Sequence, residues 1–171
     1  SDGPPHKNKS LIVVPMDAPG ITRQKIHKIG MHSSDTAQLF FDNVRVPRRN
    51  LIGQEGVGFT LQMLQFQEER LYGAAGSLRS LDRLIDQTIE YTRQRKAFGT
   101  LIADYQNTRF RLAEIKTEIE IAQTFVDRCL SEVCHEELDK AVAAMAKYWC
   151  TELMGRVLDQ CLQLHGGYGY M

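Results

Sequence analysis

The sequence lacks the features that mark several large classes of protein. Its 21 lysines and arginines are balanced by 21 aspartates and glutamates, whereas a nucleic-acid-binding protein normally carries a basic excess. No apolar run is long enough to span a membrane, and there is no signal peptide, repeat or low-complexity tract. The chain begins at Ser1 within a polar stretch and has no initiator methionine, so we expect a piece of a longer polypeptide.

Cysteine is scarce and scattered. The four cysteines are Cys129, Cys134, Cys150 and Cys161, and no two of them form a CxxC pair. The sequence therefore predicts neither a zinc site nor any other metal site. We expect four buried, reduced thiols in a reducing compartment.

Hydrophobic residues make up 43% of the 171 positions, which is enough for a core. The first part of the chain has a strand-like pattern. It predicts a strand at residues 11–14, a turn at 17–20, a second strand at 21–29 and a third stretch at 36–46 with a turn or bulge at Asp42-Asn43. Three strands are too few for a stable closed sheet, so we expect further strands upstream of this chain.

From Gly58 onward the apolar residues recur three and four positions apart, which predicts three long helices. The expected apolar positions are Leu71, Ala74, Ala75, Leu78, Leu81, Ile85 and Ile89, then Leu112, Ile115, Ile119, Ala122, Val126, Cys129 and Val133, then Val142, Met145, Trp149, Leu153 and Cys161 in a helix from about Leu138 to Leu164. Short links at 96–104 and 134–137 make neighbouring helices antiparallel. We therefore expect an α+β chain, in which the end of an antiparallel β-domain (1–57) precedes an incomplete up-down helical bundle (58–171).

Several stretches resemble the acyl-CoA dehydrogenase family in order and spacing. Gly30–Thr36 with Leu39–Pro47 resembles the end of the family's middle β-domain, and Leu51–Phe59 resembles the entry into its C-terminal helical domain. Further matches to flavin-contacting elements are Arg95-Lys-Ala-Phe-Gly99, Gln106 and Gln163-Leu-His-Gly-Gly-Tyr-Gly169. The resemblance implies that the N-terminal helical domain, the first part of the β-domain and the last helices are absent from this chain.

The resemblance also implies a function. It is the α,β-desaturation of an acyl-CoA thioester with flavin adenine dinucleotide (FAD), followed by electron transfer to an electron-transferring flavoprotein. The family pattern further implies a homotetramer, built as two dimers that share flavins, in a bacterial cytoplasm or a mitochondrial matrix. Two alternatives stay open: an acyl-CoA oxidase on the same scaffold, and a helical interaction module without catalysis.

The run Gln67-Glu-Glu-Arg70 holds the candidate base. On composition alone such a run is usually a solvated helix face. It resembles the isovaleryl-like and long-chain-like branches of the family, where the base precedes an arginine on this helix, so the resemblance assigns Glu69. Gln67 and Arg70 are then expected at the acyl-CoA site. Glu68 diverges from Glu69 by about 100° around a helix axis and is expected to face solvent.

The segment Arg95-Lys-Ala-Phe-Gly99 holds two candidate cofactor contacts. Without the family, it reads as cations at a helix C-terminus followed by a glycine cap. An arginine fork suits a pyrophosphate, and the resemblance makes Arg95 and Phe98 contacts to FAD. Gln106 is carried over in the same way.

The segment around His165 is glycine-rich. Glycines let backbone amides approach phosphate or ribose closely, although Gly166 also reads as a simple helix cap. The resemblance places Gln163, Gly166 and Gly167 at the adenine end of FAD. His165 itself is expected to pack or to cap rather than to catalyse.

Overall fold

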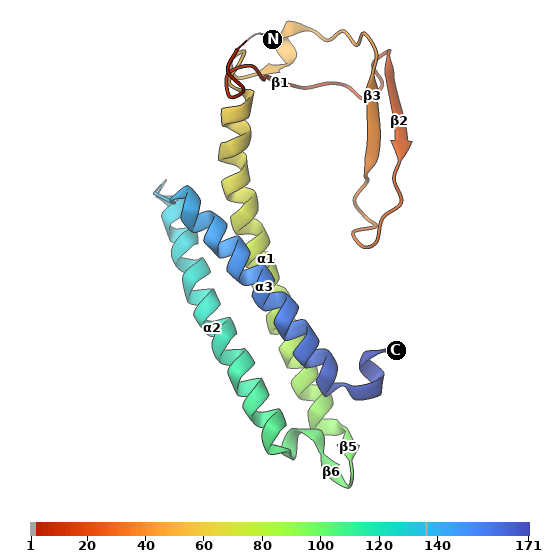
Figure 1. Cartoon of the computed structure of the whole chain (residues 1–171), viewed down its shortest axis with the longest axis vertical. Helices are drawn as coiled ribbons and strands as arrows, with labels where there is room; N and C mark the ends of the chain where they lie inside the picture. The colour runs from red at the N-terminus through yellow and green to blue at the C-terminus, as the bar shows by residue number, and fades with distance from the viewer. Residues whose placement is uncertain (1–2, 136) are drawn as a thin grey trace. The chain divides into compact units, whose positions relative to one another are not determined.

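The computed structural model describes residues 3–135 and 137–171. The chain forms two compact units, Ser1–Met63 and Leu64–Met171. Figure 1 follows the chain from a first unit of short strands into a second unit of three long helices. The α+β class predicted from the sequence is confirmed.

The first unit contains two small antiparallel sheets. Strand β1 (Leu11–Ile12) pairs with β4 (Leu51–Ile52), and β2 (Ile21–Lys25) pairs with β3 (Ala37–Phe41). A short 3-10 helix, η1 (Arg48–Asn50), leads into β4. The strand β3 is exposed along its whole length, so this unit has little core of its own.

The strands are shorter than the sequence predicts, and the segment at 44–46 is not a strand. The third stretch turns at Asn43, whose φ is 48°, immediately after β3 ends. The turn packs on Gly20 (φ 89°), where an added Cβ would overlap the carbonyl of Asp42. Residues 13–14 leave β1 because the chain opposite them is the 3-10 helix. There the Val13 amide donates to the Asn50 carbonyl at 2.9 Å, and the Asn50 side-chain amide donates to the Val13 carbonyl at 2.8 Å.

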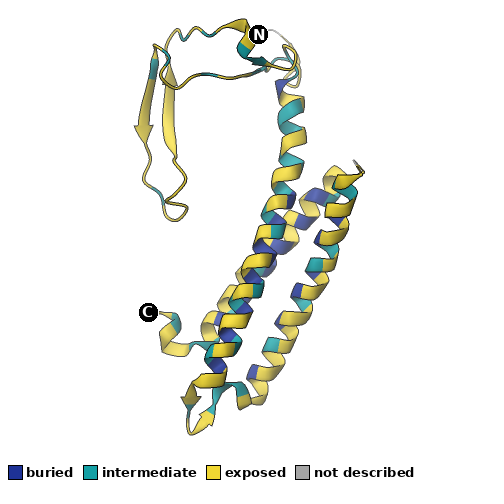
Figure 2. Ribbon diagram, turned by 180° about the vertical axis from the view of Figure 1, so that it is seen from behind, coloured by how far each residue is buried: buried dark blue, intermediate teal, exposed yellow. Residues whose placement is uncertain are grey.

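The second unit is an antiparallel three-helix arrangement of α1 (Gly58–Gln94), α2 (Gln106–Cys134) and α3 (Lys140–Leu164). Figure 2 shows the buried residues as stripes along these helices. The core is made of Leu71, Ala74, Leu78, Leu81 and Ile85 from α1, of Ile115, Ile119, Ala122, Val126 and Cys129 from α2, and of Ala146, Cys150, Leu153, Val157 and Cys161 from α3. The three predicted helices and the core faces of α1 and α2 are confirmed.

The buried face of α3 includes Leu153 and Cys161, as predicted, but differs from the prediction at Met145 and Trp149. Met145 and Trp149 are 57% and 42% exposed, while Ala146 and Cys150, one position further on, are fully buried. Both sets have helical spacing, so periodicity alone cannot choose between them. The small side chains face the core because they let α3 pack closely against its neighbours.

The links between the helices carry structure of their own. The first contains the hairpin β5 (Lys96–Ala97) and β6 (Thr100–Leu101), followed by a 3-10 turn, η2 (Ile102–Asp104). In the second, the carboxylate of Asp139 accepts a hydrogen bond from the Ala141 amide at 2.7 Å. This N-cap starts α3 at Lys140. After α3 the chain forms a last 3-10 turn, η3 (Gly166–Gly169).

Three of the four cysteines are buried, but Cys134 is exposed. The expectation of four buried thiols is therefore wrong at this position, because Cys134 is the last residue of α2, where the helix leaves the core. All four thiols are free. Burial raises the pKa of the Cys150 thiol to about 11, from an ordinary value of 9.0. Among the described residues, no helix has the length and apolarity needed to cross a membrane.

Candidate functional site

The ends of α1 and α3 form a hollow of about 520 Å³ within the helical unit. Arg95, Gly166 and Gly167, three of the predicted cofactor contacts, lie in its lining. These residues are about 70 positions apart in the sequence, and only the packing of α3 beside α1 brings them together. The other lining residues are Tyr91, Ala97, Ile102, His165, Tyr168 and Met171.

Arg95 is fixed through its backbone, while its side chain is exposed. Its amide bonds the Tyr91 carbonyl at 2.9 Å, and its carbonyl accepts from the Ile102 amide at 2.9 Å. The guanidinium carbon lies 5.6 Å from the centre of the Tyr168 ring. Within the described residues Arg95 has no carboxylate partner within ion-pair distance, so its charge is available to an anion.

The glycines beside Arg95 leave open space. Gly166 has a φ of 58°, and a Cβ added at Gly166 or Gly167 would meet nothing within 4 Å. Gly169 differs, because a Cβ there would press on the Leu162 carbonyl. The two interpretations of Gly166 from the sequence, as a helix cap and as a ligand contact, are therefore compatible. Gly166 follows the end of α3 and also exposes its backbone to the hollow.

His165 packs against Tyr91, which sequence reasoning did not single out. The two ring centres are 4.4 Å apart with planes 21° from parallel, and the Tyr91 hydroxyl donates to the His165 carbonyl at 3.2 Å. The His165 Nδ1 lies 2.9 Å from the Cys161 carbonyl, to which it can only donate. His165 thus both packs and caps, as the sequence predicted. Tyr91 could not be identified because its partner is 74 residues away.

The other candidate cofactor contacts lie outside this hollow. Phe98, at the tip of the β5–β6 hairpin, is fully exposed with a φ of 51°. Gln163 lines a separate hollow of about 350 Å³, together with Asn107 and Arg111 of α2. Gln106 is the first residue of α2, next to Asn107. The structure therefore brings together only three of the six candidates.

The candidate base lies in a third hollow, of about 380 Å³. Glu69 shares it with Phe66 and Arg70 of α1 and Lys147 of α3. The Arg70 guanidinium carbon lies 5.9 Å from the centre of the Phe66 ring. Glu68 is exposed and Gln67 half-buried, and neither lines this hollow. Sequence reasoning missed Lys147, because an exposed lysine on a helix carries no signal of the hollow opposite it.

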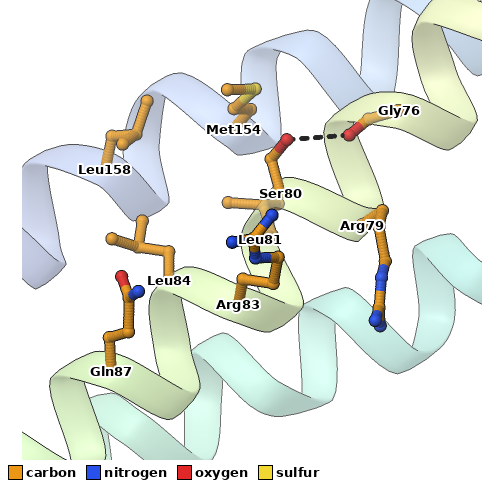
Figure 3. A pocket seen from close by; sticks show the side chains of 9 residues that line it. All are labelled: Gly76, Arg79, Ser80, Leu81, Arg83, Leu84, Gln87, Met154 and Leu158. Atoms are coloured by element: carbon orange, nitrogen blue, oxygen red, sulfur yellow. Dashed lines mark hydrogen bonds between the residues drawn. The ribbon is translucent and has the colours of Figure 1, made fainter.

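A further groove of about 420 Å³ runs between α1 and α3, and its lining contains none of the predicted site residues. Figure 3 shows its lining, with Met154 and Leu158 from α3 and the rest from α1. The Ser80 hydroxyl donates a hydrogen bond to the Gly76 carbonyl at 2.9 Å. The groove is a seam between two helices, bordered by the exposed cations Arg79 and Arg83.

Comparison with known proteins relates these features to one family. The family description "Acyl-CoA dehydrogenase, C-terminal domain" matches residues 56–171. The mitochondrial long-chain specific acyl-CoA dehydrogenase of Rattus norvegicus is 44% identical over 163 residues, which are 95% of this chain and 38% of that protein. A crystal structure of an acyl-CoA dehydrogenase from Geobacillus kaustophilus superimposes with a TM-score of 0.93 at 45% identity, covering 98% of this chain and 44% of that one.

One further relative is named as a subunit of a larger complex. Subunit CarC of the caffeyl-CoA reductase-Etf complex of Acetobacterium woodii is 31% identical over 163 residues, covering 95% of this chain and 43% of that protein. The chain thus spans about two fifths of the length of each of these relatives.

Proposed function

Because this chain belongs to the acyl-CoA dehydrogenase family, we propose that the full-length protein containing it desaturates an acyl-CoA thioester between its α and β carbons. The observation that carries the proposal is the extent of the family match, since residues 56–171 include every candidate site residue. Relatives that include the long-chain specific enzyme of Rattus norvegicus and the short-chain specific enzyme of Megasphaera elsdenii are named acyl-CoA dehydrogenases, which are oxidoreductases. The long-chain specific enzyme among them fits the placement of the base on α1.

The hollow at the ends of α1 and α3 fits the diphosphate of FAD where it meets the adenine end of the cofactor. Arg95 supplies a cation without a carboxylate partner among the described residues, and Gly166 and Gly167 leave their backbone open. These are the features that bind phosphate oxygens. Bound FAD would supply the acceptor for the hydride that leaves the β carbon. Phe98, Gln106 and Gln163 are proposed to contact other parts of so long a cofactor.

We assign the proton step to Glu69. Its carboxylate is proposed to remove the proton from the α carbon, so that the C–H bond breaks and the proton moves to a carboxylate oxygen. Arg70 and Lys147 line the same hollow and supply positive charge beside the developing negative charge of the thioester. Gln67 and Arg70 are proposed to contact the substrate.

The proposal extends to partners and assembly. We expect electrons to pass to an electron-transferring flavoprotein, which the membership of one relative in an Etf complex supports. We also expect a homotetramer. Met145, Tyr148 and Trp149 support it, because they lie at helical spacing on one exposed face of α3 and apolar clusters of this kind commonly mark interfaces. The bacterial cytoplasm or the mitochondrial matrix is the proposed compartment.

The test uses the full-length protein. It should purify yellow with bound FAD. When an acyl-CoA is added in the absence of oxygen, the flavin should be reduced in a single turnover and its visible absorbance should fall. Protein that neither retains nor rebinds FAD would refute the proposal. Readmitting oxygen to the reduced protein separates a dehydrogenase, which reoxidises slowly, from an oxidase.

A further inference from the structure

We infer that Tyr91 and His165 form a positioning pair that holds the Gly166-Gly167 segment beside Arg95. The inference rests on the proposed binding of FAD in the hollow that these residues line. Neither residue of the pair is assigned a direct bond to the cofactor. Their role is to fix the distance between two parts of one binding site that come from the ends of two different helices.

The pair joins α1 to the end of α3 by two contacts. The rings stack at 4.4 Å, and the Tyr91 hydroxyl donates to the His165 carbonyl at 3.2 Å. Both residues are partly buried, so these contacts are shielded from solvent on one side. A stacked ring pair and a shielded hydrogen bond together restrain both translation and rotation of the segment that follows.

Each member is also tied to the residue it would position. On one side, Arg95 lies one helical turn beyond Tyr91, and its amide donates to the Tyr91 backbone carbonyl at 2.9 Å, so the Tyr91 ring and Arg95 share the same end of α1. On the other, His165 directly precedes Gly166, and its Nδ1 is held by the Cys161 carbonyl at 2.9 Å. A continuous series of contacts therefore runs from Arg95 through Tyr91 and His165 to Gly166.

Glycine makes such a restraint necessary. Gly166 and Gly167 have no side chains to fix their backbone, and no atom would lie within 4 Å of an added Cβ at either position. Left alone, this segment would sample many conformations, and ordering it would weaken binding of the cofactor. His165, the residue that stacks on Tyr91, directly precedes Gly166. At that position a restraint acts most directly on the glycine segment.

The experiment measures FAD affinity in full-length apoprotein by titration of flavin fluorescence. Tyr91→Leu removes ring and hydroxyl, and we expect the Kd for FAD to rise by about tenfold. Tyr91→Phe keeps the ring and loses only the hydroxyl bond, so a rise of about threefold is expected. His165→Phe keeps a ring on Tyr91 but loses the Nδ1 bond to Cys161, and should also weaken binding. Tyr72→Leu, an exposed tyrosine on the same helix, is the matched control and should leave the Kd unchanged.

A double-mutant cycle separates positioning from general destabilisation. If the pair acts through the placement of the glycines beside Arg95, Tyr91→Leu should raise the Kd much less in an Arg95→Ala background than in the wild type. The thermal midpoint of the apoproteins should stay close to that of wild type. If Tyr91→Leu does not fold, the same cycle is run with Tyr91→Phe.

The outcomes are distinct. Wild-type protein that binds no FAD would overturn the proposed function and this inference with it. Protein that binds FAD and is weakened by Arg95→Ala, but whose Kd is unaffected by the Tyr91 and His165 substitutions, would overturn the positioning pair alone. Fully additive effects of Tyr91→Leu and Arg95→Ala would also overturn it, because the two sites would then act independently.

Discussion

Glu69→Gln is the substitution that most directly tests the proposed chemistry. The amide keeps the size and shape of the carboxylate but cannot accept the α proton of the substrate. Glu69 lines the hollow beside Arg70 and Lys147, so the change removes the single carboxylate among the residues that line it. A general base contributes about 10²–10⁴-fold to a rate, so flavin reduction by acyl-CoA should slow by at least about a hundredfold.

The assay is stopped-flow reduction of the flavin in the full-length protein, without oxygen. Flavin content should match wild type, because the Arg95 hollow shares no lining residue with the Glu69 hollow. Binding of a thioester that cannot react should change by less than about threefold, since the Arg70 side chain remains on the Phe66 ring. A slow reaction with intact binding would thus localise the defect to the chemical step.

Glu68→Gln is the matched control. The two glutamates have the same charge and lie about 100° apart around α1, and only Glu69 lines the hollow. Glu68→Gln should retain most of the rate. If Glu69→Gln reduces flavin as fast as wild type, then Glu69 is a surface charge and the base lies elsewhere. If Glu68→Gln is the inactive variant, the helix face assigned to the substrate is wrong.

Four further predictions concern the cofactor, the core and the thiols. Arg95→Ala should weaken FAD binding by about tenfold or more, measured as flavin lost on gel filtration, and full retention would refute its role. Ile119 is 1% exposed, so Ile119→Ala should lower the free energy of unfolding, measured in urea, by about 2–5 kcal/mol. Ile121 is 61% exposed, so Ile121→Ala should lower it by under about 0.5 kcal/mol. Equal losses would contradict the assigned core face. Cys134 should react with a thiol reagent in the native protein while the three buried cysteines react only on unfolding. Burial raises the pKa of the Cys150 thiol from 9.0 to about 11, so the folded state favours the neutral thiol. The stability that this thiol contributes should therefore be fully present below pH 9 and be lost between pH 9 and 11. A Cys150→Ala variant whose stability has the same pH profile as wild type would argue against this.

Helical periodicity made much of the fold predictable. The stripe on α2 alternates strictly and faces the core from Ile115 to Cys129, as expected. On α3, two sets of residues have helical spacing. Ala146 and Cys150 are buried, whereas the larger Met145 and Trp149 are exposed. Hydrophobicity could not choose between them, because the choice depends on how closely α3 approaches the other helices.

The resemblance named a set of candidate site residues, whose roles stay predictions, but it gave no arrangement for them. Arg95, Gly166 and Gly167 line one hollow and Gln163 lines another, and the resemblance did not predict this division. Lys147 had no signal of its own, and the same holds for Tyr91. Each has contacts that are distant in sequence, because Lys147 shares a hollow with Glu69 and Tyr91 stacks on His165.

The sequence by itself determined the helices, their order and the family, because turn residues, apolar spacing and motif order are local properties of the chain. The tertiary structure alone decided which face of α3 is buried, which cysteine is exposed and which candidate residues share a hollow. Those outcomes depend on contacts between residues far apart in sequence, such as Tyr91 and His165, which are 74 positions apart. A contact of that kind exists only once the helices have packed, since their packing fixes the distance between side chains that no local pattern relates.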